Sequence, residues 1–138
     1  MTIVVDTNII LERFLGLEED PAVRWLAGEG FSWAAPLLWK SELCNVLLKY
    51  IRLRGLSLEQ AREAFQEAEN VLQPNTFAVS HAKVLAVATK SGLSAYDAEY
   101  LLLALDEGVR LVTLDRQLLR AAPEVACTPE GLRASFSS

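Results

Sequence analysis

The chain has 138 residues, of which 51% are hydrophobic and 22% are charged, so it can bury a substantial core and is not a disordered chain. Its 18 acidic and 13 basic side chains give a net charge of -5. This balance argues against a nucleic-acid partner unless the acids gather in one pocket with bases at its rim. Met1 leads directly into an apolar strand, and no apolar run is long enough to span a bilayer, so neither a signal peptide nor a membrane segment is expected.

The cysteine content indicates a reducing compartment. Cys44 and Cys127 lie far apart within predicted regular elements and show no C-x-x-C spacing. Isolated cysteines of this kind are typical of small core residues. We therefore expect a cytoplasmic protein that folds as one domain over residues 1–138, a length that fits a single domain.

Hydrophobic periodicity predicts strands that alternate with helices along the chain. The segment "TIVVD" is a near-continuous apolar run that ends in Asp6, as expected of a parallel strand covered on both faces. Strands are predicted, in chain order, over residues 2–6, 31–35, 76–80, 109–114 and 125–128. Helices are predicted over residues 7–15, 20–28, 37–54, from Ser57 to about 72, 81–91, 95–107, and in a short stretch that ends at about 122.

This alternation predicts an α/β fold. Right-handed crossovers between successive strands produce a mainly parallel sheet, here of four to five strands, with helices on both faces in three layers. In such sheets, ligands bind beyond the carboxyl ends of the strands. Asp6 ends the first predicted strand and Asp115 ends the fourth, so both carboxylates are expected at the same edge.

Three of the acidic residues have a structural explanation beside the chemical one. Asp6 and Asp115 each precede a helix and suit an N-cap, and Asp6 considered alone is more easily explained as a cap. Ser94 and Asp97 resemble a capping box at the start of a later helix. The pattern at these positions leaves both interpretations open.

Glu42 is harder to explain by capping. It lies on or beside the apolar face of its helix, where the predicted buried stripe consists of Trp39, Leu43, Val46, Tyr50 and Leu53. A buried carboxylate must be paired, hydrogen-bonded or bound to a metal. Asp97 raises the same question, because it lies at the start of a helix that is apolar almost all round.

Four such acids are difficult to explain as independent caps. If Asp6, Glu42, Asp97 and Asp115 cluster, they repel one another unless a cation neutralises them. Oxygen-only ligands favour Mg²⁺ or Mn²⁺ over zinc, and the chain has no histidine and cysteine set at ligand spacing. The sequence therefore predicts a divalent metal site.

Four segments carry these acids in a characteristic order. They are "VVDTNIILE" with Asp6, "PLLWKSEL" with Glu42, "SAYDAEYLLLAL" with Asp97, and "LVTLDRQL" with Thr113 and Asp115. In this order and spacing, the set resembles PIN-domain ribonucleases, and specifically the VapC toxins of toxin–antitoxin pairs. The resemblance extends over the whole chain.

The resemblance implies a PIN-like fold and a metal-dependent endoribonuclease that hydrolyses RNA. Asp6, Glu42, Asp97 and Asp115 would hold one or two Mg²⁺ or Mn²⁺ ions, directly or through water. The metal would activate a water for in-line attack on phosphorus. The resemblance also implies a small VapB-like antitoxin as partner and a homodimer as the assembly.

Four more residues are weaker candidates for the site. Asn8 and Thr113 could orient a water or a carboxylate, and the side chain of Thr113 leaves its strand on the same face as that of Asp115. Asn8 is more easily explained as a polar residue of the first helical turn, and Thr113 as a β-branched strand residue. Lys40 and Arg116 flank the site and could contact phosphate, although each is about as easily a solvated surface charge.

Two alternatives stay open. A receiver-like signalling module also binds Mg²⁺ with acids at strand ends, but Asp6 is followed by Thr7 rather than by a second acid, and "VACTPEGL" has no lysine. A PIN fold without turnover is the other. His81 has no serine or cysteine motif with which it could form a catalytic triad, so it is interpreted as a helix-start residue. The absence of a glycine-rich phosphate loop argues against nucleotide binding.

Overall fold

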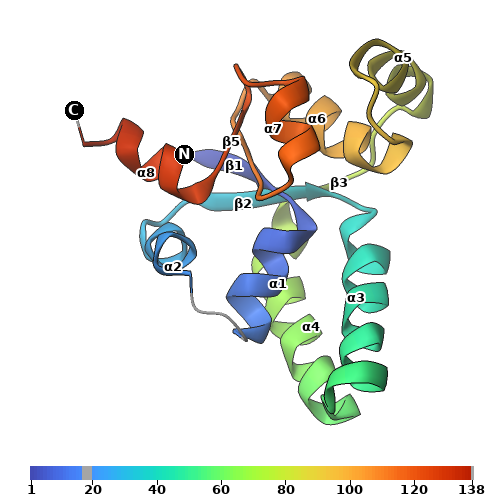
Figure 1. Ribbon diagram of the computed structural model, residues 1–138, viewed down its shortest axis with the longest axis vertical. Coiled ribbons are helices and arrows are strands. Elements are labelled where there is room, and N and C mark those ends of the chain that lie inside the picture. The colour runs from blue at the N-terminus through green and yellow to red at the C-terminus, as the bar shows by residue number, and fades with distance from the viewer. Residues whose placement is uncertain (17–19, 138) are drawn as a thin grey trace.

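A parallel sheet forms the centre of the molecule in the computed structural model, which describes residues 1–16 and 20–137 (Figure 1). Five strands within these residues pair in the order β3-β2-β1-β4-β5, and every pair is parallel. The strands are β1 (Thr2–Val5), β2 (Ser32–Pro36), β3 (Thr76–Phe77), β4 (Leu111–Val112) and β5 (Ala126–Cys127). The expected α/β fold with a mainly parallel sheet is confirmed.

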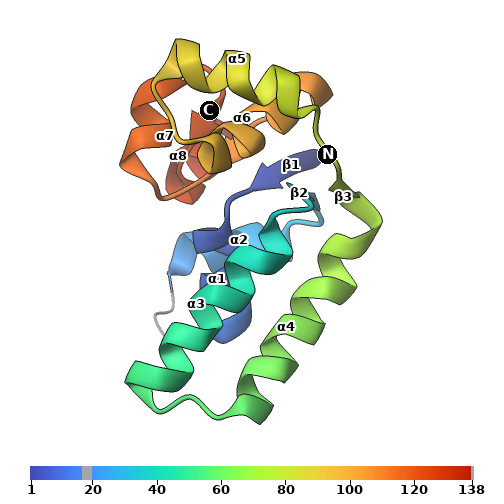
Figure 2. The ribbon, with the colours of Figure 1, turned by 90° about the vertical axis from the view of Figure 1, so that its right-hand side faces the viewer.

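Helices cover both faces of this sheet (Figures 1 and 2). The first face carries α1 (Thr7–Leu15), α2 (Pro21–Gly28), α3 (Trp39–Arg54) and α4 (Leu58–Leu72). The opposite face carries α5 (His81–Ser91), α6 (Ala95–Glu107) and α7 (Arg116–Ala121). A 3-10 turn, η1 (Gln73–Asn75), leads into β3, and α8 (Pro129–Ser135) ends the described chain. None of the helices in the described ranges is long and apolar enough to cross a membrane.

The central strand explains the opening sequence. Ile3, Val4 and Val5 are all 0% exposed, because helices cover β1 on both sides. β1 pairs with β2 through Ile3 and Trp33, and with β4 through Val5 and Val112. This register places the residues that follow β1 and β4 side by side at the carboxyl edge, as expected for Asp6 and for the segment around Asp115.

Several strands are shorter than the apolar runs suggested. Only Thr76–Phe77 of the predicted strand 76–80 pairs, and only Leu111–Val112 of 109–114 does. Helix caps follow soon after both strands: the Ser80 side chain accepts from the backbone N–H of Lys83, and the Asp115 side chain accepts from that of Gln117. Strand pairing therefore ends before the apolar runs do.

The predicted buried stripe of α3 is partly wrong. Trp39 and Leu43 are buried as expected, but Leu53 is 78% exposed, and Leu47 completes the buried stripe. The last turns of α3 lie in a hairpin with α4 that extends away from the sheet, so they have no core to enter (Figure 2). Cys44, expected in the core, is exposed on this helix, whereas Cys127 is buried.

Helix α8 was not predicted, although its start carries clear signals. The Thr128 side chain accepts from the backbone N–H of Gly131 at 2.9 Å, and Pro129 occupies the first turn. The segment packs against α2 through an aromatic cluster, in which the ring centroids of Trp25, Phe31 and Phe136 lie 5.9 to 6.0 Å apart.

Candidate active site

Asp6 is both a helix cap and a buried acid. Its backbone N–H donates to the Val112 carbonyl at 3.0 Å, which fixes it at the end of β1. Its carboxylate accepts from the Thr7 backbone N–H at 2.8 Å and from the Thr113 hydroxyl at 2.8 Å. Only 6% of Asp6 is exposed. Capping and a site role are therefore compatible at this position.

Thr113 links the acids at the ends of β1 and β4. It is 0% exposed, donates to Asp6 Oδ2, and accepts from the Asp115 backbone N–H at 3.0 Å. Asn8 adds a second link, because its amide donates to Asp6 Oδ2 at 3.3 Å and accepts from the Leu114 N–H at 3.3 Å. Both side chains therefore contact Asp6 as well as the backbone that leads to Asp115.

Glu42 lies in the first turn of α3 and is held by two hydroxyl groups. The Thr7 hydroxyl donates to Glu42 Oε1 at 2.9 Å, and the Tyr100 hydroxyl donates to the same atom at 2.7 Å. The two hydroxyl oxygens are themselves 2.7 Å apart. Neither Thr7 nor Tyr100 was recognised in the sequence as part of the site.

Asp97 lies in the first turn of α6, and its backbone N–H donates to the Ser94 side chain at 3.1 Å. This is the cap that the sequence suggested. Its carboxylate is half-buried and interacts with the side chain of Ser94, and it forms no ion pair with any residue in the described ranges. The cap therefore explains the position of Asp97 but does not neutralise its charge.

The four acids affect one another electrostatically. Burial raises the pKa of Asp6 from 3.8 to about 6, against the opposing effect of hydrogen bonds from Thr113 and Thr7. The charges of Asp97 and Glu42 raise this pKa further.

The pKa of Asp97 is raised as well. Burial is the main cause, and the charges of Asp115 and Glu42 add to it, while the Ser94 hydrogen bond opposes it. Asp6, Glu42, Asp97 and Asp115 therefore form one electrostatic cluster, which we call the acidic site.

The donors of the acidic site fit a hydrated hard cation. Within the described residues, no three histidine, cysteine or acidic side chains converge as a closed metal shell would require. Mg²⁺, however, keeps several waters and is commonly held by one or two carboxylates. Oxygen-only donors, mutual repulsion and the raised pKa values of Asp6 and Asp97 all suit such an ion.

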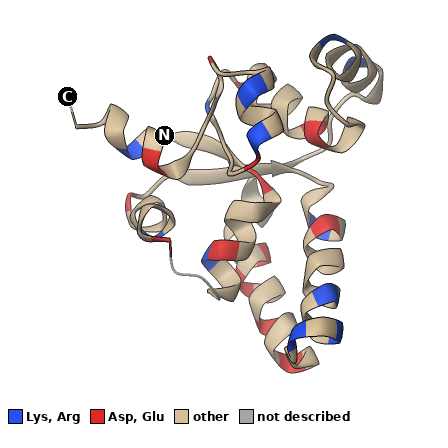
Figure 3. Ribbon diagram, in the orientation of Figure 1, with Lys and Arg blue, Asp and Glu red and all other residues tan. Residues whose placement is uncertain are grey.

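The two basic residues that were expected to flank the acidic site have different surroundings (Figure 3 shows the charged residues along the chain). Arg116 is exposed in the first position of α7, directly after Asp115. Lys40, the other candidate phosphate contact, pairs with Glu69 of α4 at 3.2 Å.

The sequence did not indicate that Glu99 is a further acid near the acidic site. Burial and the charge of Glu42 raise the pKa of Glu99, whereas His81, whose Nε2 lies 3.9 Å from Glu99 Oε2, lowers it.

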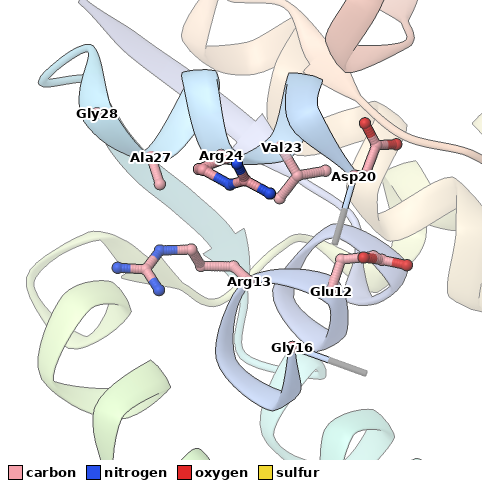
Figure 4. Close-up of a pocket in the computed structure, with 8 residues that line it drawn as sticks. All are labelled: Glu12, Arg13, Gly16, Asp20, Val23, Arg24, Ala27 and Gly28. Carbon is pink, nitrogen blue, oxygen red and sulfur yellow. The ribbon is translucent and has the colours of Figure 1, made fainter. Parts of the chain in front are cut away.

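A separate hollow lies between α1 and α2 and has a volume of about 350 Å³ (Figure 4). It is lined by charged and small residues, namely Glu12, Arg13, Gly16, Asp20, Val23, Arg24, Ala27 and Gly28. None of the four acids of the acidic site lines it, so the two features are distinct.

The raised pKa of Asp6 predicts how metal-free stability depends on pH. Because this pKa is about 6 in the folded protein and 3.8 ordinarily, the folded state holds more protons than the unfolded state between these values. The free energy of unfolding should therefore fall as pH rises from about 4 to 6, by about 3 kcal/mol for this group. Urea unfolding in EDTA at several pH values, compared with Asp6→Asn, isolates the effect. A wild type that gains stability relative to the variant over this range would contradict it.

Comparison with known proteins places this geometry in context. A protein-family model described as PIN domain matches residues 3–124. Ribonuclease VapC3 of Pyrobaculum aerophilum is 31% identical over 127 residues, which cover 89% of this chain and 96% of that protein. The crystal structure of PAE2754 from Pyrobaculum aerophilum superposes with a TM-score of 0.78 at 25% identity, covering 99% of this chain and 98% of that one. A toxin–antitoxin complex from Klebsiella pneumoniae has the same fold, with a TM-score of 0.66 at 21% identity over 92% of this chain and 97% of that one.

Proposed function

The chain belongs to the PIN domain family, and we propose that it is a Mg²⁺- or Mn²⁺-dependent endoribonuclease, the toxin of a VapBC-like pair. The observation that carries the proposal is the acidic site, where buried Asp6 is coupled to Asp97 and Glu42 at the carboxyl edge of the sheet. The relative named Ribonuclease VapC3 supports the same activity. The receiver-like alternative is wrong, because the family match extends over residues 3–124.

Asp6, Glu42, Asp97 and Asp115 are the proposed metal-holding residues. A bound divalent ion would supply Lewis acidity, an activated water and charge neutralisation at the phosphate. The chain itself prepares the carboxylates. Thr113 and the Thr7 N–H hold Asp6, and its pKa of about 6 leaves it mainly ionised at neutral pH. This ionised state is the one that binds a cation.

The half-buried Asp97 carboxylate has no cationic partner within the described residues, so a bound metal ion would supply the positive charge that it lacks. Asp115 is oriented by its own cap, since its Oδ1 accepts from the Gln117 N–H at 2.7 Å. Arg116 follows it and is exposed, which suits a contact with the phosphate backbone of RNA. Lys40 would have to leave Glu69 to make a similar contact, so we propose it only as a secondary phosphate ligand.

We further propose a VapB-like antitoxin as the protein partner, a homodimer as the assembly and the cytoplasm as the location. The antitoxin is supported by the fold shared with a toxin–antitoxin complex and by an apolar groove of about 530 Å³ on α3 and α4, lined in part by Leu48, Ile51 and Phe65. The unpaired Cys44 and Cys127 suit a reducing compartment. Light scattering with and without the product of the neighbouring gene tests the two assemblies.

A cleavage assay on labelled RNA tests the proposed activity. We expect cleavage in millimolar Mg²⁺ or Mn²⁺, its loss in excess EDTA and its return when the metal is restored, because metal neutralises the acidic site. Unchanged cleavage in EDTA would show that the metal-site interpretation is wrong. RNA that stays intact under all conditions, although the protein binds the ion, would favour a PIN fold without turnover.

A further inference from the structure

We propose that Tyr100 is a positioning residue, which acts together with Thr7 to hold the Glu42 carboxylate in its metal-binding orientation. This inference rests on the proposed function. Tyr100 is 0% exposed, yet its hydroxyl lies 2.7 Å from Glu42 Oε1 and 2.7 Å from the Thr7 hydroxyl. The three residues belong to α6, α3 and α1, so one polar contact joins three helices at the acidic site.

These contacts leave the second oxygen of the Glu42 carboxylate, Oε2, available to bind a metal ion. Both hydroxyl oxygens lie within hydrogen-bond distance of Oε1, and no residue in the described ranges donates to Oε2. A carboxylate held at one oxygen in this way presents the other in a fixed direction. This is how outer hydrogen-bond donors orient the ligands of a metal ion.

The helix spacing ties this contact to a second acid. Asp97 and Tyr100 are three residues apart on α6, so their side chains lie on the same face, one turn apart. The ring of Tyr100 is enclosed in the core, which restricts the movement of its hydroxyl group. The helix that supplies Asp97 therefore also sets the position of Glu42.

Repulsion makes this support necessary. The charge of Glu42 acts on Asp6, Asp97 and Glu99 and raises the pKa of each, so these acids repel Glu42 when all are ionised. Without donors at Oε1, the Glu42 side chain is expected to rotate away from the acidic site. Donated hydrogen bonds to a charged group are stronger than neutral ones and oppose this rotation.

The number of available protons predicts which of the two hydroxyls can donate a hydrogen bond to Glu42. Three oxygen–oxygen contacts of 2.7 to 2.9 Å join Glu42, Thr7 and Tyr100, but with Glu42 ionised only two hydroxyl protons are available. The contact between the two hydroxyl oxygens can hold only one proton. If both protons take part in these three contacts, at least one hydroxyl therefore donates to Glu42. Removal of either hydroxyl leaves the other to donate, whereas removal of both leaves none.

The test measures metal binding separately from cleavage. The variants are Tyr100→Phe, Thr7→Val and the double variant, with Tyr96→Phe as the matched control, because Tyr96 lies on the same helix and is 61% exposed. The dissociation constant for Mn²⁺ is measured by calorimetry, the metal-induced rise in melting temperature by thermal scans, and RNA cleavage as a function of metal concentration. Thr7→Ser, which keeps a hydroxyl, serves as the conservative rescue.

We expect each single variant to weaken Mn²⁺ binding about tenfold and the double variant by more than the product of the two, because outer donors typically contribute about 10- to 100-fold. Cleavage should need correspondingly more metal and recover partly at saturation. Thr7→Ser should bind metal more tightly than Thr7→Val. A folded double variant with wild-type metal affinity overturns the inference, as does a wild type that binds no metal. A wild type that binds Mn²⁺ without cutting RNA refutes the proposed activity alone.

Discussion

Replacement of Asp97 by asparagine is expected to remove RNA cleavage while leaving the metal-free protein as stable as the wild type, or more stable. The cap at this position uses the backbone N–H of Asp97, which asparagine retains. Burial and the charges of Asp115 and Glu42 raise the pKa of the Asp97 carboxyl, so its charge is unfavourable in the folded protein without metal. Loss of that charge relieves repulsion.

The opposite is expected once metal is present. The wild type should gain stability from millimolar Mg²⁺ or Mn²⁺ by mass action, and Asp97→Asn should gain less, because it lacks a proposed ligand. Cleavage should fall by about a thousandfold or more, since residues of one catalytic unit act together and not additively. Melting curves with and without metal, alongside the cleavage assay, measure both effects.

Asp106→Asn is the matched control, because Asp106 lies on the same helix near its other end and is exposed. It should change neither the metal-induced shift in melting temperature nor cleavage. If Asp97→Asn behaves like Asp106→Asn in both assays, Asp97 is only a first-turn helix residue and the acidic site has been assigned wrongly.

The fold was predictable because its main signals are local. The apolar run that ends in Asp6 indicated a covered parallel strand, and Ile3, Val4 and Val5 are indeed fully buried. Caps such as that of Ser57, whose side chain accepts from the Gln60 N–H at 3.0 Å, marked helix starts correctly. Strand lengths were less predictable, since pairing depends on neighbours that are distant in sequence and an apolar run continues beyond them.

The acids of the site were visible in the sequence, but the groups that hold them were not. Asp6 and Asp115 follow strands, and Glu42 lies beside an apolar stripe, so topology alone brings them toward one edge. Tyr100 is separated from Thr7 by 93 residues and from Glu42 by 58, and as an aromatic residue on an apolar helix it is expected in the core. Only the three-dimensional arrangement shows that its hydroxyl meets a carboxylate.

Thr113 provides the second large expected effect, because one buried hydroxyl serves two acids. Thr113→Val keeps the shape of the side chain but removes the donor to Asp6 Oδ2 and the acceptor for the Asp115 N–H. The loss of such buried polar partners is expected to cost about 1–3 kcal/mol of stability. Metal affinity should fall by about 10- to 100-fold, toward the upper end because only the longer Asn8 contact still donates to Asp6 Oδ2.

The pH profile distinguishes a site role of Thr113 from a purely structural one. The Thr113 hydrogen bond lowers the pKa of Asp6, which is nevertheless about 6, so its removal raises this pKa further and keeps the carboxyl protonated at higher pH. Because metal binding needs the ionised form, cleavage and metal binding by Thr113→Val should begin at higher pH than in the wild type. Thr113→Ser, which retains the hydroxyl, should restore much of the wild-type profile. If Thr113→Val is less stable but keeps the wild-type pH profile and metal affinity, Thr113 supports the fold alone, and Asp6 does not depend on it for its charge.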